Sequence, residues 1–333
     1  MAKQRVAWIS ILQAITIIAV MIGHVDVAGD MNPDYPVACW LDKLQAFQMP
    51  VFFFISGFLY VRSSLFMKSY LELVKSKWMR LVVPFLFMSF LMWGFKLCLN
   101  QSMLEHPVSL SWSYFMNVLF APWDGPIRHL WFVESLLLYF LLTPLYKWTL
   151  DNKYCALGGI VVGIFITFLP SILVVPNPNV LTYGRACSHF VYFYLGMVAM
   201  KFDLVRYAQN YGVLVLAPII YYTLLVVPSL LPYQYLWIYF VGIPYIISLS
   251  WFLAERWTNL LSNVGKYSYQ IYLLHMLPIM VWKFIFKRHL IGDDTLWFSM
   301  CWIGSLLCAV YVPVLVAKVA EKCPKQLRML IGL

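Results

Sequence analysis

The sequence contains few charged side chains. Asp, Glu, Lys and Arg make up 11% of its 333 residues, whereas a soluble domain contains about a quarter of them. Hydrophobic residues account for 62% of the chain, and its mean hydropathy is +0.77. This composition excludes a soluble globular domain and predicts a polytopic membrane protein.

Other absences narrow the class further. The seven cysteines show no Cys-x-x-Cys pair and no Cys/His metal spacing, so neither a redox motif nor a bound metal is predicted. The chain lacks a repeat of fixed period, a low-complexity tract and a soluble appendage, and we expect one integral-membrane domain over residues 1–333. The first apolar run is too long for a cleavable signal peptide and lacks a small-residue cleavage site, which favours a retained anchor.

The apolar stretches predict an all-α protein with about ten transmembrane helices, each near the roughly 20 residues that a span needs. They cover residues 6–27, 46–61, 81–99, 129–146, 155–175, 187–200, 212–230, 236–253, 268–286 and 297–317. The net charge of +10 does not indicate nucleic-acid binding, because the positive residues lie mainly between these stretches. Most Lys and Arg residues face the cytoplasm if the N-terminus is inside, so both termini are predicted to be cytoplasmic.

A polar stripe on the first span is the strongest functional signal. His24 lies near its outer end, Gln13 is eleven residues earlier on the same face, about 16 Å away, and Ser10 is one turn below Gln13. A titratable side chain at bilayer depth is a functional-site candidate. We interpret His24 as a general base, since a positioned imidazole accelerates hydroxyl chemistry by about 10²–10⁴-fold. The alternative is a buried histidine bonded to a neighbouring helix.

Four residues on the predicted outer side are candidates for binding a substrate. His129 and Trp131 open the fourth span, and Arg185 and His189 flank the start of the sixth. Interface anchoring and core packing are the alternatives. The preceding outer loop, about residues 100–128, is rich in aromatic residues and predicts a short interfacial helix, with sugar stacking as the second interpretation.

Two groups on the predicted inner side are candidates for binding an anionic cofactor. The segment from Arg62 to Arg80 is helical in pattern and basic, and its Lys75, Lys77 and Arg80 suit either phosphate binding or membrane topology. In the ninth span Ser268, Tyr272 and His275 share one helical face. For these we favour a structural hydrogen-bond network over a place on the cofactor path, and we expect His275 to lie too deep to reach His24.

Six segments, in order along the chain, resemble the acyltransferase-3 family of membrane acyltransferases. They are ISILQAITIIAVMIGH, which ends at His24, QMPVFFFISGFLY, KWMRLVVPF, HLWFVESLL, FYLGM and VGKYSYQIYLLHMLPI. The family usually has an acidic residue and, three residues later, Arg or Lys where this chain has Ser10 and Gln13. Losing both charges together avoids an orphan buried charge.

The resemblance implies transfer of an acyl group, most often acetyl, from a coenzyme A thioester to a hydroxyl. The implied donor is cytoplasmic acetyl-CoA, used as a substrate and not as a bound cofactor. The implied acceptor is a cell-surface or lipid-linked glycan, and the implied location is a bacterial inner membrane. His24 is then the base, or less favourably the carrier of a covalent acyl group. Gln13 and Ser10, with the four outer residues, would contact the substrate.

A glycan or small-anion transporter or flippase that lacks transferase chemistry is the alternative from another functional class. Ser10 and Gln13, in place of the family's usual charged pair, favour this alternative. Against it, the chain shows neither inverted repeats nor matched broken helices. A non-catalytic subunit of an envelope-polymer complex is a third possibility. It gives no reason for an intramembrane histidine.

Overall fold

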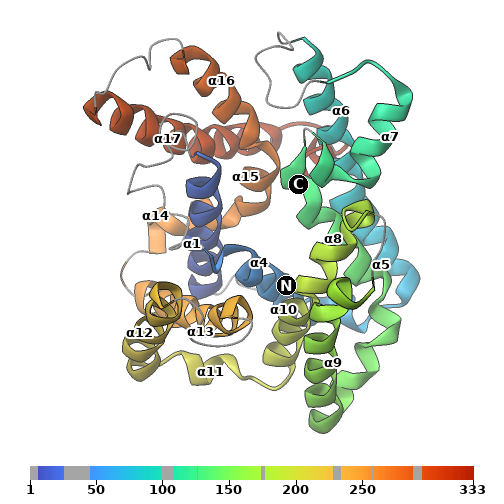
Figure 1. Ribbon diagram of the computed structural model, residues 1–333, viewed down its shortest axis with the longest axis vertical. Coiled ribbons are helices and arrows are strands. Elements are labelled where there is room, and N and C mark those ends of the chain that lie inside the picture. The colour runs from blue at the N-terminus through green and yellow to red at the C-terminus, as the bar shows by residue number, and fades with distance from the viewer. Residues whose placement is uncertain are drawn as a thin grey trace. The chain divides into compact units, whose positions relative to one another are not determined.

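The computed structural model describes residues 7–25, 46–98, 108–125, 127–173, 177–227, 234–254, 256, 258–287 and 295–333. Throughout these residues the regular elements are helices (Figure 1). Five helical stretches in the described part are long and apolar enough to cross a membrane: Ala7–His24, Tyr70–Leu97, Lys153–Ile172, Gln234–Ala254 and Met300–Ala320. The protein is therefore an all-α polytopic membrane protein, as predicted.

Every predicted span contains a helix. These are α1 (Ala7–His24), α4 (Gln48–Arg62), α6 (Val83–Leu97), α8 (Trp131–Leu141), α9 (Lys153–Ile172), α10 (Tyr183–Lys201), α12 (Tyr211–Val226), α13 (Gln234–Ala254), α15 (Ser268–Leu274) followed by α16 (Met276–Lys287), and α17 (Thr295–Ala320). The predicted short helix of the aromatic loop is α7 (Trp112–Phe120). The remaining α-helices of the described residues are α5 (Tyr70–Lys77), α11 (Val205–Ala208), α14 (Thr258–Lys266) and α18 (Lys325–Met329).

Short 3₁₀ turns occur near the helix ends of the central part of the chain. They are η1 (Ser64–Met67), η4 (Pro122–Asp124), η5 (Arg128–Leu130), η6 (Thr143–Leu145), η7 (Lys147–Asp151) and η8 (Val180–Thr182).

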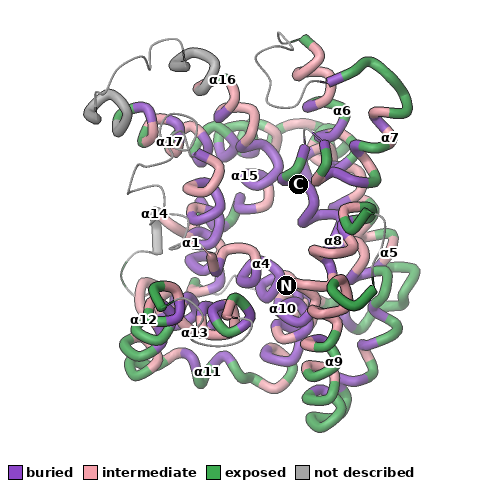
Figure 2. Tube along the Cα trace, in the orientation of Figure 1, coloured by how far each residue is buried: buried purple, intermediate pink, exposed green. Residues whose placement is uncertain are grey.

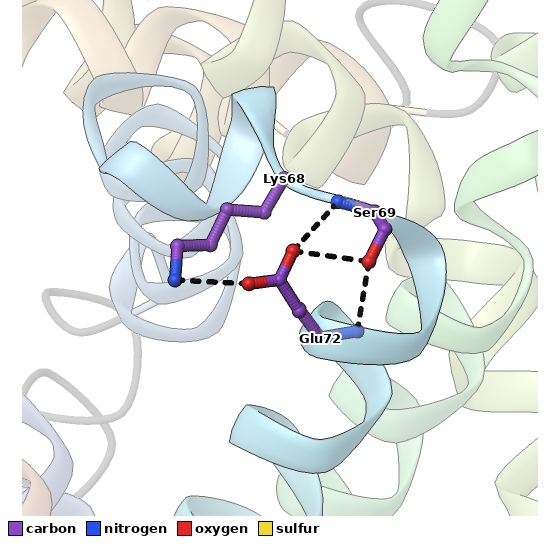
Figure 3. A network of polar contacts seen from close by, with 3 residues as sticks. All are labelled: Lys68, Ser69 and Glu72. Carbon is purple, nitrogen blue, oxygen red and sulfur yellow. Dashed lines mark hydrogen bonds and ion pairs between the residues drawn. The ribbon is translucent and has the colours of Figure 1, made fainter.

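The third span starts earlier than predicted, because α5 runs into α6 through a π-helical turn, Trp78–Val82. Ser69 begins α5 with a capping box: its hydroxyl accepts from the Glu72 amide, and the Glu72 carboxylate accepts from the Ser69 amide (Figure 3). Lys68 pairs with the other oxygen of Glu72 at 3.2 Å. The wider π turn ends two residues before Pro84, which has no amide hydrogen to donate.

The chain forms two compact units. Unit 1 comprises Met1–Phe52 and Asp203–Val319, and unit 2 comprises Phe53–Phe202 and Ala320–Leu333. In unit 1, α1 packs against α13, α14 and α15, and α12 packs against α13 (Figure 1). In unit 2, α9 packs along α10, which also contacts α8.

Small residues permit the closest helix approaches within unit 2. A side chain at Gly57 of α4 would overlap the Phe193 carbonyl oxygen of α10, and one at Gly196 of α10 would overlap that of Phe54. Such reciprocal contacts are typical of membrane helices, where small residues let backbones meet. Phe52, Phe53 and Phe54 of α4 are all buried and contribute to this packing.

Burial separates two kinds of helix. Figure 2 shows α1 and α15 mostly buried, whereas α9 and α12 carry many exposed positions. The exposed positions of α9 are largely apolar, including Leu157, Val161 and Phe165. In a membrane protein such a surface faces hydrocarbon.

Candidate active site

The polar face of α1 is covered by other helices of unit 1. Ser10 is buried, and Gln13 and His24 are half-buried. The closest approach is at Ser10, whose carbonyl oxygen lies so near Gly265 of α14 that a side chain at Gly265 would overlap it. A hydrogen in place of a side chain therefore allows α14 to lie directly on α1.

Helix α15 brings His275 to His24, and the ring centroids are 4.9 Å apart with planes tilted by 40°. The expectation that His275 lies too deep to reach His24 is therefore wrong. Gly265 anchors α14 beside Ser10, and the ten residues that follow rise by about 15 Å if helical. His275 is thereby carried toward the end of α1 that holds His24.

The hydrogen bonds of His275 fix its tautomer. Its Nδ1 lies 2.7 Å from the carbonyl oxygen of Tyr272 and 3.2 Å from that of Ile271. Because a carbonyl oxygen only accepts, Nδ1 carries the hydrogen, and in the neutral ring Nε2 is then the acceptor. The His275 side chain is fully buried. Two imidazoles, one in a defined tautomer, thus face each other inside unit 1.

Tyr272 belongs to the same region, with its ring centroid 6.2 Å from that of His275. Tyr272 and Ser268 are both buried, so the polar face of α15 points into the protein. Places for Tyr272 and His275 on a cofactor path stay predictions.

In unit 2, three of the four predicted substrate residues come together. The Arg185 guanidinium lies over the Trp123 ring, 3.1 Å from its centroid, and 5.5 Å from the centroid of Trp131. The ring centroids of His189 and Trp131 are 5.2 Å apart. We call Trp123, Trp131, Arg185 and His189 the tryptophan–arginine cluster. A guanidinium stacked on indole keeps its edge donors for another group.

His189 is held by its own helix and by aromatic neighbours. Its Nδ1 lies 2.9 Å from the Arg185 carbonyl oxygen, and its ring centroid is 5.2 Å from that of Phe53. The fourth predicted residue, His129, lies in η5 and is 5% exposed. It is therefore not an exposed interfacial anchor. On the next helix, α8, Glu134 is also buried, and its Oε2 accepts no hydrogen bond within the described chain.

Sequence reasoning missed the polar contacts that order the loop around this cluster. Asp124 accepts hydrogen bonds from the side-chain amides of Asn177 and Asn179, at 2.9 and 2.6 Å. The Asn177 side chain also accepts from the Asn179 amide, as in an Asx turn. The Asn-Pro-Asn sequence signals this turn, but nothing local signals its partner Asp124.

The start of α10 is held in an unusual conformation. Leu181 and Thr182 have φ values of 50° and 48°, a left-handed backbone that non-glycine residues rarely adopt. The hydroxyls of Thr182 and Ser135 are 3.1 Å apart, and the Gly184 amide donates to the Pro178 carbonyl oxygen at 2.9 Å. These bonds secure the backbone three residues before Arg185.

The predicted cofactor-binding lysines and arginine lie around α5. Lys75 and Arg80 are exposed. The Lys77 ammonium instead lies 3.6 Å from the centroid of the Phe140 ring, a cation–π contact. The structure thus leaves Lys75 and Arg80 accessible to an anion and commits Lys77 to a neighbouring ring. Cofactor binding by all three stays a prediction.

The sequence profile of one family, described as an acyltransferase domain, matches residues 6–317, which is nearly the whole chain. Neither a curated protein nor a solved structure matches this chain significantly.

Proposed function

Because this chain belongs to the acyltransferase-3 family, we propose that it moves an acyl group, acetyl in the simplest case, from acyl-CoA to a hydroxyl of a cell-surface or lipid-linked glycan. The setting we propose is a bacterial inner membrane, with both termini in the cytoplasm and acyl-CoA supplied from that side. The contact between His24 and His275 carries the proposal, because it provides a held imidazole inside the membrane domain.

In this reaction His24 is the general base. Its unprotonated nitrogen takes the proton of the acceptor hydroxyl while that oxygen attacks the thioester carbonyl carbon. The carbon–sulfur bond then breaks, and the imidazolium returns the proton to the departing coenzyme A sulfur. An ester and free coenzyme A are formed, and no oxidant or further reactant is consumed.

His275 is a positioning residue in this scheme. Its Nε2, an acceptor because Nδ1 is committed to the Tyr272 carbonyl, is suited to receive an N–H from His24. That bond would select the His24 tautomer whose other nitrogen is free of hydrogen. A catalytic base needs this control of tautomer and orientation, since a misplacement of about 1 Å costs up to about 10²-fold in rate.

For the acceptor we propose the tryptophan–arginine cluster of unit 2. Arg185 offers donors beside the aromatic surface of Trp131, a combination suited to a sugar, and His189 lies against the same indole ring. His129, Ser10 and Gln13 remain proposed substrate contacts. Lys75 and Arg80 are proposed to bind donor phosphates, and Tyr272 to line the donor path.

The test uses membranes that contain wild-type or variant protein and acetyl-CoA labelled in its acetyl group. Label that enters glycans as alkali-labile esters is counted, and the esters are identified by mass spectrometry. We expect His24→Ala to lower ester formation by at least about 10²-fold. His275→Ala should lower the maximal rate by up to about 10²-fold with little change in the acceptor KM.

The matched control on α1 is Thr16→Val. Within the described part of the chain, the Thr16 hydroxyl bonds to the Leu12 carbonyl of its own helix, at 2.6 Å, so its loss should leave acylation unchanged. Ordinary ester formation by folded His24→Ala protein would overturn the catalytic assignment. Acceptor flux without any ester would instead favour a transporter.

A further inference from the structure

Unit 2 contains an apolar cavity of about 840 Å³ that the proposed reaction does not use. It lies among α8, α9, α10 and the turns η7 and η8, and we call it the α9–α10 cavity. Its volume is within the range of ligand-binding sites, about 300–1,000 Å³. Rim residues such as Leu145, Trp148 and Val162 are exposed, so the cavity is open on one side.

Each of two helices contributes one continuous face to this cavity. The α9 face consists of Cys155, Gly158, Val162 and Ile166, and the α10 face of Tyr183, Cys187, Phe190 and Tyr194. Each set spans twelve residues, and the eleven steps between the first and the last cover about 16 Å of helix. One leaflet occupies about half of the 30 Å hydrocarbon core. The cavity is therefore about as long as one leaflet is deep.

Most hydroxyls around the cavity are bonded within the protein, and the exception among the described residues is the buried Tyr183 hydroxyl at the start of α10. Tyr139 donates to the Ala186 carbonyl oxygen at 2.6 Å, Tyr146 donates to the Tyr139 carbonyl oxygen, and the hydroxyls of Tyr194 and Thr149 bond to each other. Most of the wall therefore presents rings and aliphatic groups to a ligand. Such a wall selects hydrocarbon and disfavours a sugar or a nucleotide.

The glycines of α9 differ in their surroundings: Gly159 and Gly163 pack against α10, whereas Gly158 borders open space. A side chain at Gly159 would overlap the Tyr194 ring, and one at Gly163 would crowd Val191 at 3.3 Å, so these glycines let α9 and α10 meet. A Cβ at Gly158 would have no atom within 4 Å. The open volume beside Gly158 is therefore not closed by a neighbouring side chain.

The mouth of the cavity adjoins the lipid-facing surface of α9. Gly158, Val162 and Ile166 each follow one residue after Leu157, Val161 and Phe165, which are exposed and apolar. Consecutive residues are about 100° apart around a helix, and Gly158 and Val162 are themselves exposed, so the cavity opens onto the hydrocarbon-facing side of α9. The abundant ligand at that place is the fatty acyl chain of a bilayer lipid.

We propose that the α9–α10 cavity binds one acyl chain of a membrane phospholipid, with the chain lying along α9 and α10. This proposal does not depend on the acyltransferase chemistry, because it rests on the shape and lining of unit 2 alone.

The experiment reconstitutes the full chain in vesicles of phosphatidylethanolamine and phosphatidylglycerol that include a phosphatidylethanolamine with a diazirine in its acyl chain. After illumination, adducts are mapped by mass spectrometry. We expect adducts concentrated on the less exposed lining positions Ala186, Cys187 and Phe190, compared with the exposed positions Val215 and Ile219 of α12. Equal labelling of both sets would overturn the proposal, since it would indicate only the general lipid shell.

Two substitutions fill the cavity, and one matched substitution does not. Gly158→Phe should reduce adducts at Cys187 by about tenfold or more, and Val162→Trp provides a second blocked variant. Gly94→Phe on α6 is the control, because Gly94 also has no atom within 4 Å of an added Cβ and does not line the cavity. Unreduced labelling in either folded cavity variant would overturn the proposal.

A competition arm identifies the source of the hydrocarbon. Unlabelled phosphatidylethanolamine should displace the probe from Cys187, whereas a polyprenyl phosphate at the same concentration should not. Displacement by the polyprenyl phosphate alone would overturn the assignment to a phospholipid. Acylation activity measured in the same vesicles reports separately on the proposed function.

Discussion

Helices α1 and α9 are similar in length and apolar character, yet they are used differently. Of the most apolar part of α1, 56% of residues are buried inside the protein, compared with 11% in α9. Helix α1 carries Ser10, Gln13 and His24 on a face that other helices cover, whereas α9 turns Leu157 and Phe165 outward. Hydrophobicity alone therefore does not tell a helix that carries chemistry from one that faces lipid. The polar stripe on α1 makes that distinction.

The sharpest contrast is expected from adding a side chain to a glycine in each setting. Gly265→Leu should destabilise the protein by more than about 3 kcal/mol, because the new Cβ overlaps the Ser10 backbone and α14 must move away from α1. Gly158→Leu should leave stability unchanged or raise it by up to about 1 kcal/mol, since leucine is the better helix former. Thermal unfolding of the purified proteins measures both. Equal losses would break the contrast.

A charge on the covered face of α1 should have the next largest effect. Gln13→Arg places a cation on this face beside a neutral Ser10 and should cost about 2–3 kcal/mol, the penalty for arginine within a span. Ser10→Asp in the same chain supplies a partner three residues away and should recover much of the loss. Stability and ester formation are measured for the single and double variants. A double variant no better than Gln13→Arg would contradict the coupling of these two positions.

Small reductions in side-chain size should have the smallest effects on stability and should still distinguish α1 from α9. Ile17→Val on α1 removes a fully buried methylene and should cost about 1 kcal/mol. Phe165→Leu on the exposed side of α9 should stay within about 0.5 kcal/mol, because lipid replaces the lost contacts. Chemical or thermal unfolding in one detergent compares them, and a larger loss for Phe165→Leu would show that α9 has a protein partner there.

The helices were predictable because apolar runs and local signals specify them. The aromatic loop contains a helix, α7, and the basic segment before the third span is helical. Its junction with α6 was missed, because Lys75, Lys77 and Arg80 suggested a loop between spans. The Ser69–Glu72 capping box, visible in the sequence as Ser-x-x-Glu, marks the true start.

The site was predictable in its members but not in its pairings. An intramembrane histidine pointed to His24 from its burial cost alone. Its contact with His275 joins residues 251 positions apart, and no local periodicity encodes which helices meet. Gly265 allows that meeting through the absence of a side chain, which is a weak signal in a sequence with 16 glycines. The stacking of Arg185 on Trp123 was missed for the same reason.

The left-handed pair Leu181 and Thr182 makes the start of α10 intolerant of changes in length. Most surface loops absorb an extra residue by bulging outward, but this one is bonded to Asp124 on one side and Ser135 on the other. An insertion that propagated into α10 would rotate every later side chain by about 100° around the helix axis. Arg185 would leave the Trp123 face and Gly196 would leave the Phe54 backbone together, so a single step in loop length would disturb recognition and helix packing at once.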